Sequence, residues 1–305
     1  MIQLNVSNET ALLRHVVLGT AEACGPTPTA AQAYDPKSLV HILAGTYPAE
    51  ADMVPQMESV CAVLEKHGVT VHRPQIKTDV NQIFARDIGF VIEDKLFRSN
   101  IIDQRAEEFD AVRPVLQAAV PDLQVIEIPN HVSVEGGDVL LDGDAIFVGT
   151  YSGEDFETYM SCRTNTAAVD YLQAQFPNKT VRGFDLIKSN TDGKANVLHL
   201  DCCFQPVGRG GALLCADAFV RPEDAAYLRD RYGAEHVFAL NMDQVYDMKA
   251  NLFSISPEVV ISDQSFTEVN AWLTGRGIQV ETVDYSEISK QGGLFRCSTL
   301  PLQRS

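Results

Sequence analysis

Basic residues are scarce in this sequence. Lysine and arginine together number 24 against 41 aspartates and glutamates, which gives a chain of 305 residues a formal net charge of −17. Because a protein that binds nucleic acid needs a basic face to neutralise phosphates, this charge argues against a nucleic-acid partner. Most of the carboxylates serve solubility, and a negative field of this kind also attracts a cationic substrate.

Long apolar runs are missing as well. No stretch approaches the roughly 18 apolar residues that a membrane-spanning helix needs. The N-terminal residues lack the basic region followed by an apolar region that marks a signal peptide. The seven cysteines are an odd number without the spacing of a disulfide framework. We therefore expect a cytoplasmic protein with free thiols and no membrane contact.

The common metal and nucleotide motifs are also absent. Cys202 and Cys203 follow His199 and Asp201, but no C-x₂-C pair or H-E-x-x-H helix accompanies this cluster. On a strand, adjacent cysteines point to opposite faces, so we expect one thiol in the core and one partly exposed. The glycine-rich "GRGGA" at residues 208–212 is too short for a phosphate-binding loop. We expect neither a metal nor a cofactor.

No linker rich in proline, serine or glycine divides the chain, so we expect one domain over residues 1–305. The longest irregular stretch, Cys24–Ser38, is predicted to be a surface excursion. Apolar residues that recur every three or four positions predict five helices, at about residues 50–67, 104–119, 155–175, 223–232 and 263–275.

Short β-rich pieces between these helices share one pattern. Asp87 opens "DIGFVIEDKLF", Asp138 opens "DVLLDGDAIFVGT" and Asp201 opens "DCCFQPVGRGGALLC". Each piece is an acid, an apolar strand, a tight turn and a second strand. Weaker echoes occur at "LRHVVLGT" and "ISPEVVISDQSF". Five such units separated by helices predict a ring of repeats, in which the three acids face one central cavity.

Four stretches are polar where a strand would be apolar: "NQIFARD", "VEGGD", "HLDCC" and "RCST". In "HLD", a strand would aim His199 and Asp201 at the same face. In "VEGGD", the glycines allow a turn or a close backbone approach that leaves Glu135 at a strand entrance. Taken singly, Glu135 suits a turn, His199 a satisfied core histidine and Cys297 a small buried hydrophobe. The four polar stretches together are stronger evidence for a functional site than any one of these residues.

Together these residue types indicate one kind of chemistry. A nucleophilic thiol must ionise, and cationic surroundings favour the thiolate. Carboxylates beside it would oppose ionisation unless a cation stood between them. A planar guanidinium is such a cation, because carboxylates bind it through two parallel hydrogen bonds. A histidine within reach would move protons to and from the nucleophile and the leaving amine. The pattern therefore predicts attack of a thiolate on a guanidinium carbon.

The order and spacing of "NQIFARD", "VEGGDV", "HLDCCF" and "GGLFRCST" resemble the guanidino-group-modifying superfamily, which includes arginine deiminase, dimethylarginine dimethylaminohydrolase and the amidinotransferases. The resemblance extends from "LRHVVLGT" to Cys297. It implies an α/β fold, the five-bladed α/β propeller of ββαβ repeats called the pentein.

The resemblance also implies roles for six residues. Cys297 matches the nucleophile that forms a covalent thiouronium intermediate, and His199 matches the acid-base histidine. Glu135 matches the carboxylate that orients the site. The matches to substrate-binding residues are the guanidinium pair Asp87 and Asp201, and Asn81, which contacts the amino-acid part of the substrate.

Two positions depart from the pattern of relatives or stay unassigned. Arg296 stands where relatives often carry histidine. Arg86 has no assigned role. The arginines that would hold a substrate carboxylate also stay open, with three candidates: Arg163, Arg182 and Arg209.

The resemblance favours hydrolysis of arginine or a derivative, with citrulline and ammonia as products from free arginine. Amidinotransferases generally carry aspartate where this chain has Glu135, which favours water as the acceptor. Transfer of the amidino group to an amine, and a second hydrolysis that gives ornithine, remain alternatives. A papain-like hydrolase does not fit, because its cysteine precedes its histidine. A non-catalytic arginine binder would need the acids but not Cys297, His199 and Glu135 together. Many relatives self-associate, so a homo-oligomer is possible.

Overall fold

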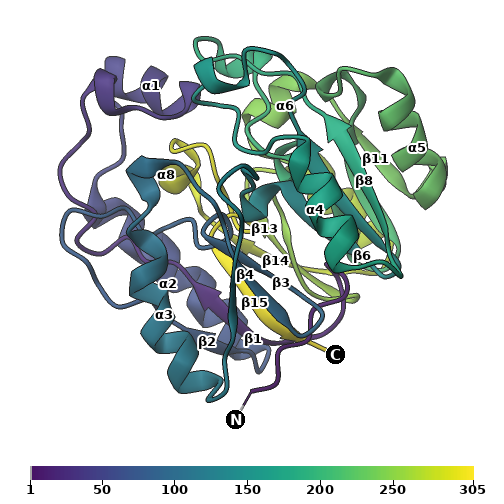
Figure 1. Ribbon diagram of the computed structural model, residues 1–305, viewed down its shortest axis with the longest axis horizontal. Helices are drawn as coiled ribbons and strands as arrows, with labels where there is room; N and C mark the ends of the chain where they lie inside the picture. The colour runs from purple at the N-terminus through teal and green to yellow at the C-terminus, as the bar shows by residue number, and fades with distance from the viewer. Residues whose placement is uncertain (1) are drawn as a thin grey trace.

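The computed structural model describes residues 2–305 and consists of five small sheets of three strands each (Figure 1). In every sheet the first strand pairs antiparallel with the central strand, and the central strand pairs parallel with the third. A parallel partner cannot follow through a tight turn, so each central strand is joined to the third strand by a helical crossover. Each sheet is therefore one ββαβ blade, as the sequence repeats predict.

Four blades follow chain order. They comprise β3 (Gly89–Ile92), β4 (Lys95–Arg98) and β5 (Val125–Glu127); β6 (Val139–Asp142), β7 (Ala145–Thr150) and β8 (Thr180–Asp185); β9 (Phe204–Val207), β10 (Gly211–Cys215) and β11 (Val237–Leu240); and β12 (Phe253–Ser256), β13 (Val259–Asp263) and β14 (Gln279–Val283). Their crossover helices are α3 (Glu108–Ala119), α4 (Ala167–Gln175), α5 (Pro222–Tyr232) and α7 (Thr267–Gly275).

The fifth blade joins the two ends of the chain. Its central strand is β1 (Leu13–Leu18), which pairs parallel with β2 (Thr70–His72) after the crossover helix α2 (Glu50–Lys66). Its first strand is β15 (Thr299–Arg304), the last element of the chain, which runs antiparallel to β1. Figure 1 shows β15, in yellow, beside the purple β1. The C-terminal residues thus close the ring.

The buried side chains form two hydrophobic clusters between the sheets and their helices. Figure 1 shows α2, α3 and α5 at the periphery of the molecule, with the strands between them. Three further helices are α1 (Pro36–Leu43), α6 (Met242–Tyr246) and α8 (Ser286–Ser289). Among residues 2–305, no helix has the length and apolar character needed to cross a bilayer.

Two of the expected elements differ from the structure. The helix predicted at 155–175 is only Ala167–Gln175, because the preceding residues form a short 3₁₀ turn (Phe156–Thr158) and irregular chain. The stretch Cys24–Ser38 is not simply a surface excursion. It ends in the first turn of α1, and Tyr34 and Asp35 lie against a pocket described below.

Truncation of Leu302, which lies in β15, would measure how much this strand contributes to the stability of the ring. Its side chain is fully buried in β15, so Leu302→Ala should lower the free energy of unfolding by about 2–5 kcal/mol. Urea denaturation followed by circular dichroism measures this. Leu43→Ala is the matched control, because Leu43 is 71% exposed and its truncation should change stability little. A Leu302→Ala variant as stable as the Leu43→Ala variant would contradict the closing role of β15.

Candidate active site

Each of the five blades carries a polar or thiol side chain in the segment that leads into its first strand. Asp87 precedes β3, Glu135 precedes β6, His199 precedes β9, Asn251 precedes β12 and Cys297 precedes β15. All five side chains are buried. The ring therefore brings residues that are far apart in the sequence to one centre, and four of them belong to the set predicted from the sequence.

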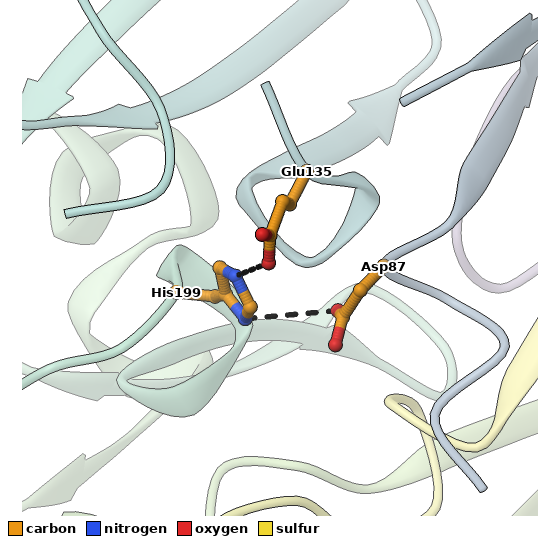
Figure 2. A group of neighbouring side chains, drawn as sticks. All are labelled: Asp87, Glu135 and His199. Carbon is orange, nitrogen blue, oxygen red and sulfur yellow. Dashed lines mark hydrogen bonds and ion pairs between the residues drawn. The ribbon is translucent and has the colours of Figure 1, made fainter. Parts of the chain in front are cut away.

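His199 links two of the carboxylates (Figure 2). Its Nε2 lies 2.8 Å from Oε2 of Glu135, and its Nδ1 lies 3.7 Å from Oδ1 of Asp87. Burial alone would lower the pKa of His199, but the charges of Asp87 and Asp138 and the hydrogen bond to Glu135 outweigh it and raise the pKa to about 9. The imidazole is therefore protonated at neutral pH, and it holds a proton that it can donate.

The two glycines of "VEGGD" allow this approach. A Cβ atom on Gly137 would lie 2.6 Å from Nδ1 of His199, and one on Gly136 would lie 2.1 Å from the carbonyl oxygen of Arg86. Neither distance is possible for a real side chain. The glycines serve close backbone contact, which is one of the two roles expected from the sequence.

Asp87 is held by an arginine that the sequence analysis missed. Nη1 of Arg105 donates to Oδ2 of Asp87 at 2.7 Å, and the same guanidinium donates to both carboxylate oxygens of Glu108. All three residues are buried. The other oxygen of Asp87, Oδ1, has no hydrogen-bond partner in the described chain. Asp87 is thus fixed by Arg105 on one side, while its other oxygen lies 3.7 Å from Nδ1 of His199 and can still accept a hydrogen bond.

Glu135 is paired with a second arginine. Nη1 of Arg163 lies 3.2 Å from both oxygens of Glu135, and Nη2 of Arg163 donates to the carbonyl of Tyr34 at 2.7 Å. Burial would raise the pKa of Glu135, but the charge of Arg163 and the bond to His199 lower it to about 2. Glu135 is therefore a permanent anion that stabilises the protonated imidazole of His199.

The sulfur of Cys297 lies between an amide and a carboxylate. Nδ2 of Asn251 donates to Sγ at 3.2 Å, and Oδ2 of Asp201 lies 3.7 Å from the same atom. The hydrogen bond with the thiol of Cys202, burial and the charge of Asp201 raise the pKa of Cys297 well above its usual range. The described chain therefore holds Cys297 as a neutral thiol.

Asp201 is itself neutralised by Arg296. Nη1 of Arg296 donates to Oδ2 of Asp201 at 2.8 Å, and its Nε and Nη2 donate to the two oxygens of Glu9 at 3.1 and 3.0 Å. Arg86 supports the same segment, because its backbone N–H donates to the carbonyl of Cys297 at 2.9 Å. Arg296, which stands where relatives often carry histidine, thus anchors the strand entrance that carries the thiol.

A small cavity lies in front of the sulfur. Its volume is about 10 Å³, which is room for roughly one water molecule. The lining residues come from several blades and from the segment before α1: Tyr34, Asp35, Phe84, Asp87, Arg105, Arg163, Leu198, His199, Gln291, Gly292, Gly293 and Cys297.

A much larger outer cleft of about 1130 Å³ shares Tyr34, Arg105 and Gln291 with the inner cavity. A small organic molecule could therefore occupy the outer cleft next to the inner cavity.

The six predicted site residues lie in the wall of the inner cavity, directly behind that wall, or in the outer cleft. Cys297, His199 and Asp87 line the inner cavity, and Glu135 lies behind His199. Asp201 lies behind Cys297 and does not line the cavity. Asn81 lines the outer cleft, where it donates to Gln291.

The three arginines that could hold a substrate carboxylate lie in different parts of the structure. Arg163 lines the inner cavity. Arg182 is instead paired with Asp224, and Arg209 with the exposed Glu258.

Two local expectations about "HLDCC" were wrong. Leu200–Cys202 form a 3₁₀ turn and not a strand, so His199 and Asp201 turn to different partners. Cys202 and Cys203 are both buried, so neither is partly exposed. The three strand-opening acids do not all face the cavity either. Asp138 instead accepts from the backbone N–H of Leu200 at 2.9 Å.

One group of side chains has the spacing of metal ligands: Asp87, Glu135 and His199, with ligand atoms within 4.8 Å of one another. It differs from the cysteine-containing cluster considered from the sequence. Glu135 already accepts from Arg163 and His199, and Asp87 accepts from Arg105. A metal ion would compete with these positive charges, so the donor set fits an organic cation at the free oxygen of Asp87 better.

Residues 47–304 match the family described as "N,N dimethylarginine dimethylhydrolase, eukaryotic". The chain belongs to this family, which lies within the guanidino-modifying pentein superfamily of hydrolases and amidinotransferases. The uncharacterized protein YkgA of Bacillus subtilis (strain 168) is 31% identical over 255 residues, which cover 82% of this chain and 79% of YkgA.

Solved structures share the fold at lower identity. The inosamine-phosphate amidinotransferase STRB1 of Streptomyces griseus is 18% identical, with a TM-score of 0.74 over 99% of this chain and 97% of its own. The N-terminal domain of ArgZ, an arginine dihydrolase of cyanobacteria, is 19% identical, with a TM-score of 0.74 over 95% of this chain and 97% of its own. The five-bladed pentein fold is therefore confirmed.

The environment of Cys297 predicts a slow thiol in the ligand-free protein. Because its pKa is raised, alkylation by iodoacetamide at pH 8 should be at least about tenfold slower than for a free cysteine, whose pKa is about 8.5. The rate should keep rising as the pH passes 9. Mass spectrometry of the peptide that contains Cys297 measures it, with Cys297→Ser as the blank. A rate that levels off below pH 8 would show that the thiol ionises readily.

Proposed function

We propose that the protein is a cysteine-dependent hydrolase that acts on the guanidinium carbon of arginine or of an arginine derivative. One observation carries the proposal: Cys297, His199 and Asp87 line one buried cavity, where Oδ1 of Asp87 accepts no hydrogen bond within the described chain. The family to which the chain belongs supports a guanidino substrate. The seven cysteines are all free, which supports a reducing, cytoplasmic location.

Asp87 would bind the substrate and help to ionise the nucleophile. Its Oδ1 accepts no hydrogen bond within the described chain and faces Nδ1 of His199 at 3.7 Å. It would accept from guanidinium N–H groups, while Arg105 keeps the carboxylate in place. The bound cation would offset the negative charges that hold the proton on Cys297. The thiol would therefore become a thiolate only when a substrate is present.

Arg163 is the best of the three considered anchors for a substrate carboxylate. It lines the inner cavity, and its bonds to Met160, Glu135 and Tyr34 leave some of its five N–H donors unused. A carboxylate that displaced the carbonyl of Tyr34 would gain a charge-assisted bond.

The reaction would proceed in two halves. When the substrate is bound, the thiol of Cys297 releases its proton to solvent water, because His199 is already protonated. The thiolate attacks the guanidinium carbon, and the C–N bond to one nitrogen breaks as His199 donates its proton to that leaving amine. The product of this half is a thiouronium adduct on sulfur. The neutral imidazole then takes a proton from water, the resulting hydroxide attacks the same carbon, and the C–S bond breaks. Free arginine would give citrulline and ammonia, and a methylated arginine would give citrulline and the methylamine.

Amidino transfer is the second candidate. The fold is shared with the amidinotransferase STRB1, although at 18% identity this likeness concerns the fold alone. The glutamate at position 135 favours water over an amine acceptor, by resemblance to the hydrolases. An arginine dihydrolase shares the fold as well, so ornithine is a product to be sought beside citrulline.

Cys297→Ser should abolish turnover by about 10⁴-fold or more and leave the fold intact, because oxygen replaces sulfur with little change in shape. The assay incubates the protein with arginine, methylated arginines or agmatine and quantifies citrulline, ornithine, ammonia and amines. An added amine acceptor that becomes amidinated would identify a transferase. Turnover that survives in Cys297→Ser would refute the nucleophile, and no product from any guanidino compound would favour a non-catalytic binder.

Asp87→Asn should chiefly weaken substrate binding. The amide keeps the shape but loses the charge that faces the cavity, so KM should rise about tenfold or more. Asp224→Asn is the matched control, since Asp224 is also a buried partner of arginines but lies outside the cavity. An Asp87→Asn variant with an unchanged KM would remove Asp87 from the binding site.

A further inference from the structure

Asp35 begins helix α1 and reaches the same cavity as the nucleophile. Its Oδ1 accepts from the backbone N–H of Ser38 at 2.8 Å, which caps the helix, and Pro36 follows at the first helical position. Oδ1 of Asp35 therefore has a structural role as the cap of α1. This leaves the second oxygen without a structural role.

The second carboxylate oxygen of Asp35, Oδ2, is buried and accepts no hydrogen bond within the described chain. Among residues 2–305, Asp35 also forms no ion pair. The positive charge of Arg163 acts on it, but Arg163 is paired with Glu135. Asp35 is 7% exposed, and burial raises its pKa. A buried carboxylate oxygen without a partner is costly, so a site of this kind is usually completed by a ligand or by water.

Asp35 and Asp87 share this condition within one cavity. Both line the inner cavity with Cys297, and each has one oxygen that accepts no hydrogen bond within the described chain. The oxygen of Asp87 also lies 3.7 Å from Nδ1 of His199, and that of Asp35 has no ion-pair partner among the described residues. Asp201, the acid expected to complete the guanidinium pair, is instead bonded to Arg296 and does not line the cavity. The second acid available to a bound cation is therefore Asp35.

The chain makes room for Asp35 at the glycine pair near its end. Gly292 has a φ of +78°, and a Cβ atom there would lie 3.0 Å from Oδ1 of Asp35. A side chain at this position would be strained by the positive φ and would crowd the carboxylate of Asp35. The glycine thus keeps Asp35 beside the strand entrance that carries Cys297.

We propose that Asp35 is a substrate-binding residue whose free oxygen accepts a hydrogen bond from a positively charged N–H group of the bound guanidino compound. The proposal rests on the proposed function and names the second acid of that same site. The donor is either the guanidinium itself or an α-ammonium group, and both present the same chemistry to the carboxylate.

Asp35→Asn separates binding from helix capping. Asparagine caps a helix as well as aspartate does, so the variant should keep its thermal stability. It loses the charge that faces the cavity, so KM should rise about tenfold or more. Calorimetric titration in the Cys297→Ser background should show an equal rise in Kd. Asp192→Asn is the matched control: Asp192 caps a turn by accepting from the backbone N–H of Lys194 and does not line the inner cavity.

Two substrates identify the donor. Arginine carries both cationic groups, and 5-guanidinopentanoate lacks the α-ammonium. An equal loss with both compounds places Asp35 on the guanidinium, and a loss with arginine alone places it on the ammonium. A KM and Kd within about twofold of the wild type for both compounds would overturn the proposal. A wild-type protein without turnover would instead contradict the proposed function, and it is recognised without any Asp35 variant.

Discussion

The antiparallel pairing of β1 with β15 is the contact on which the site depends. This pairing completes the fifth blade, because β15 supplies the first strand beside the central strand β1. Cys297 thus enters the centre from the segment that leads into the first strand of its blade, as Asp87, Glu135 and His199 do in theirs. β1 lies near the start of the chain and β15 at its end, and backbone hydrogen bonds pair the two strands. Cys297 lies just before β15, next to this pairing.

Charge compensation decides what each acid at this centre can do. Arginines neutralise three carboxylates from behind: Arg105 at Asp87, Arg163 at Glu135 and Arg296 at Asp201. These pairs satisfy part of each carboxylate and fix its position, since a buried charge without a partner is strongly destabilising. Only the oxygens left over can serve a ligand. Within the inner cavity those belong to Asp87 and Asp35.

The sequence predicted the repeats and the core of the site, but not the partners of its acids. Strand patterns and turn residues are local, so the blades and the order of Asp87, Glu135, His199 and Cys297 could be predicted. The partners are not local: Glu9 binds Arg296 and Asn251 binds Cys297 across most of the chain or between blades. Asp201 was assigned to the substrate because a strand would align it with His199, and the 3₁₀ turn at Leu200–Cys202 removes that alignment. Asp35 lies in a stretch rich in alanine, proline and threonine that predicts only a loop.

A thiol beside so many carboxylates is a poor nucleophile in the empty protein, and this has a chemical use. The hydrogen bond with Cys202, burial and the charge of Asp201 raise the pKa of Cys297, which lowers the reactivity of its sulfur toward oxidants and electrophiles. A guanidinium that bound between Asp87 and Asp35 would cancel part of the negative charge next to the sulfur. The same interaction that holds the substrate would then create the thiolate. Neutral urea-like products such as citrulline carry no such charge at the reacting carbon. Their formation would return the proton to the sulfur and weaken the contact with both acids, which favours release.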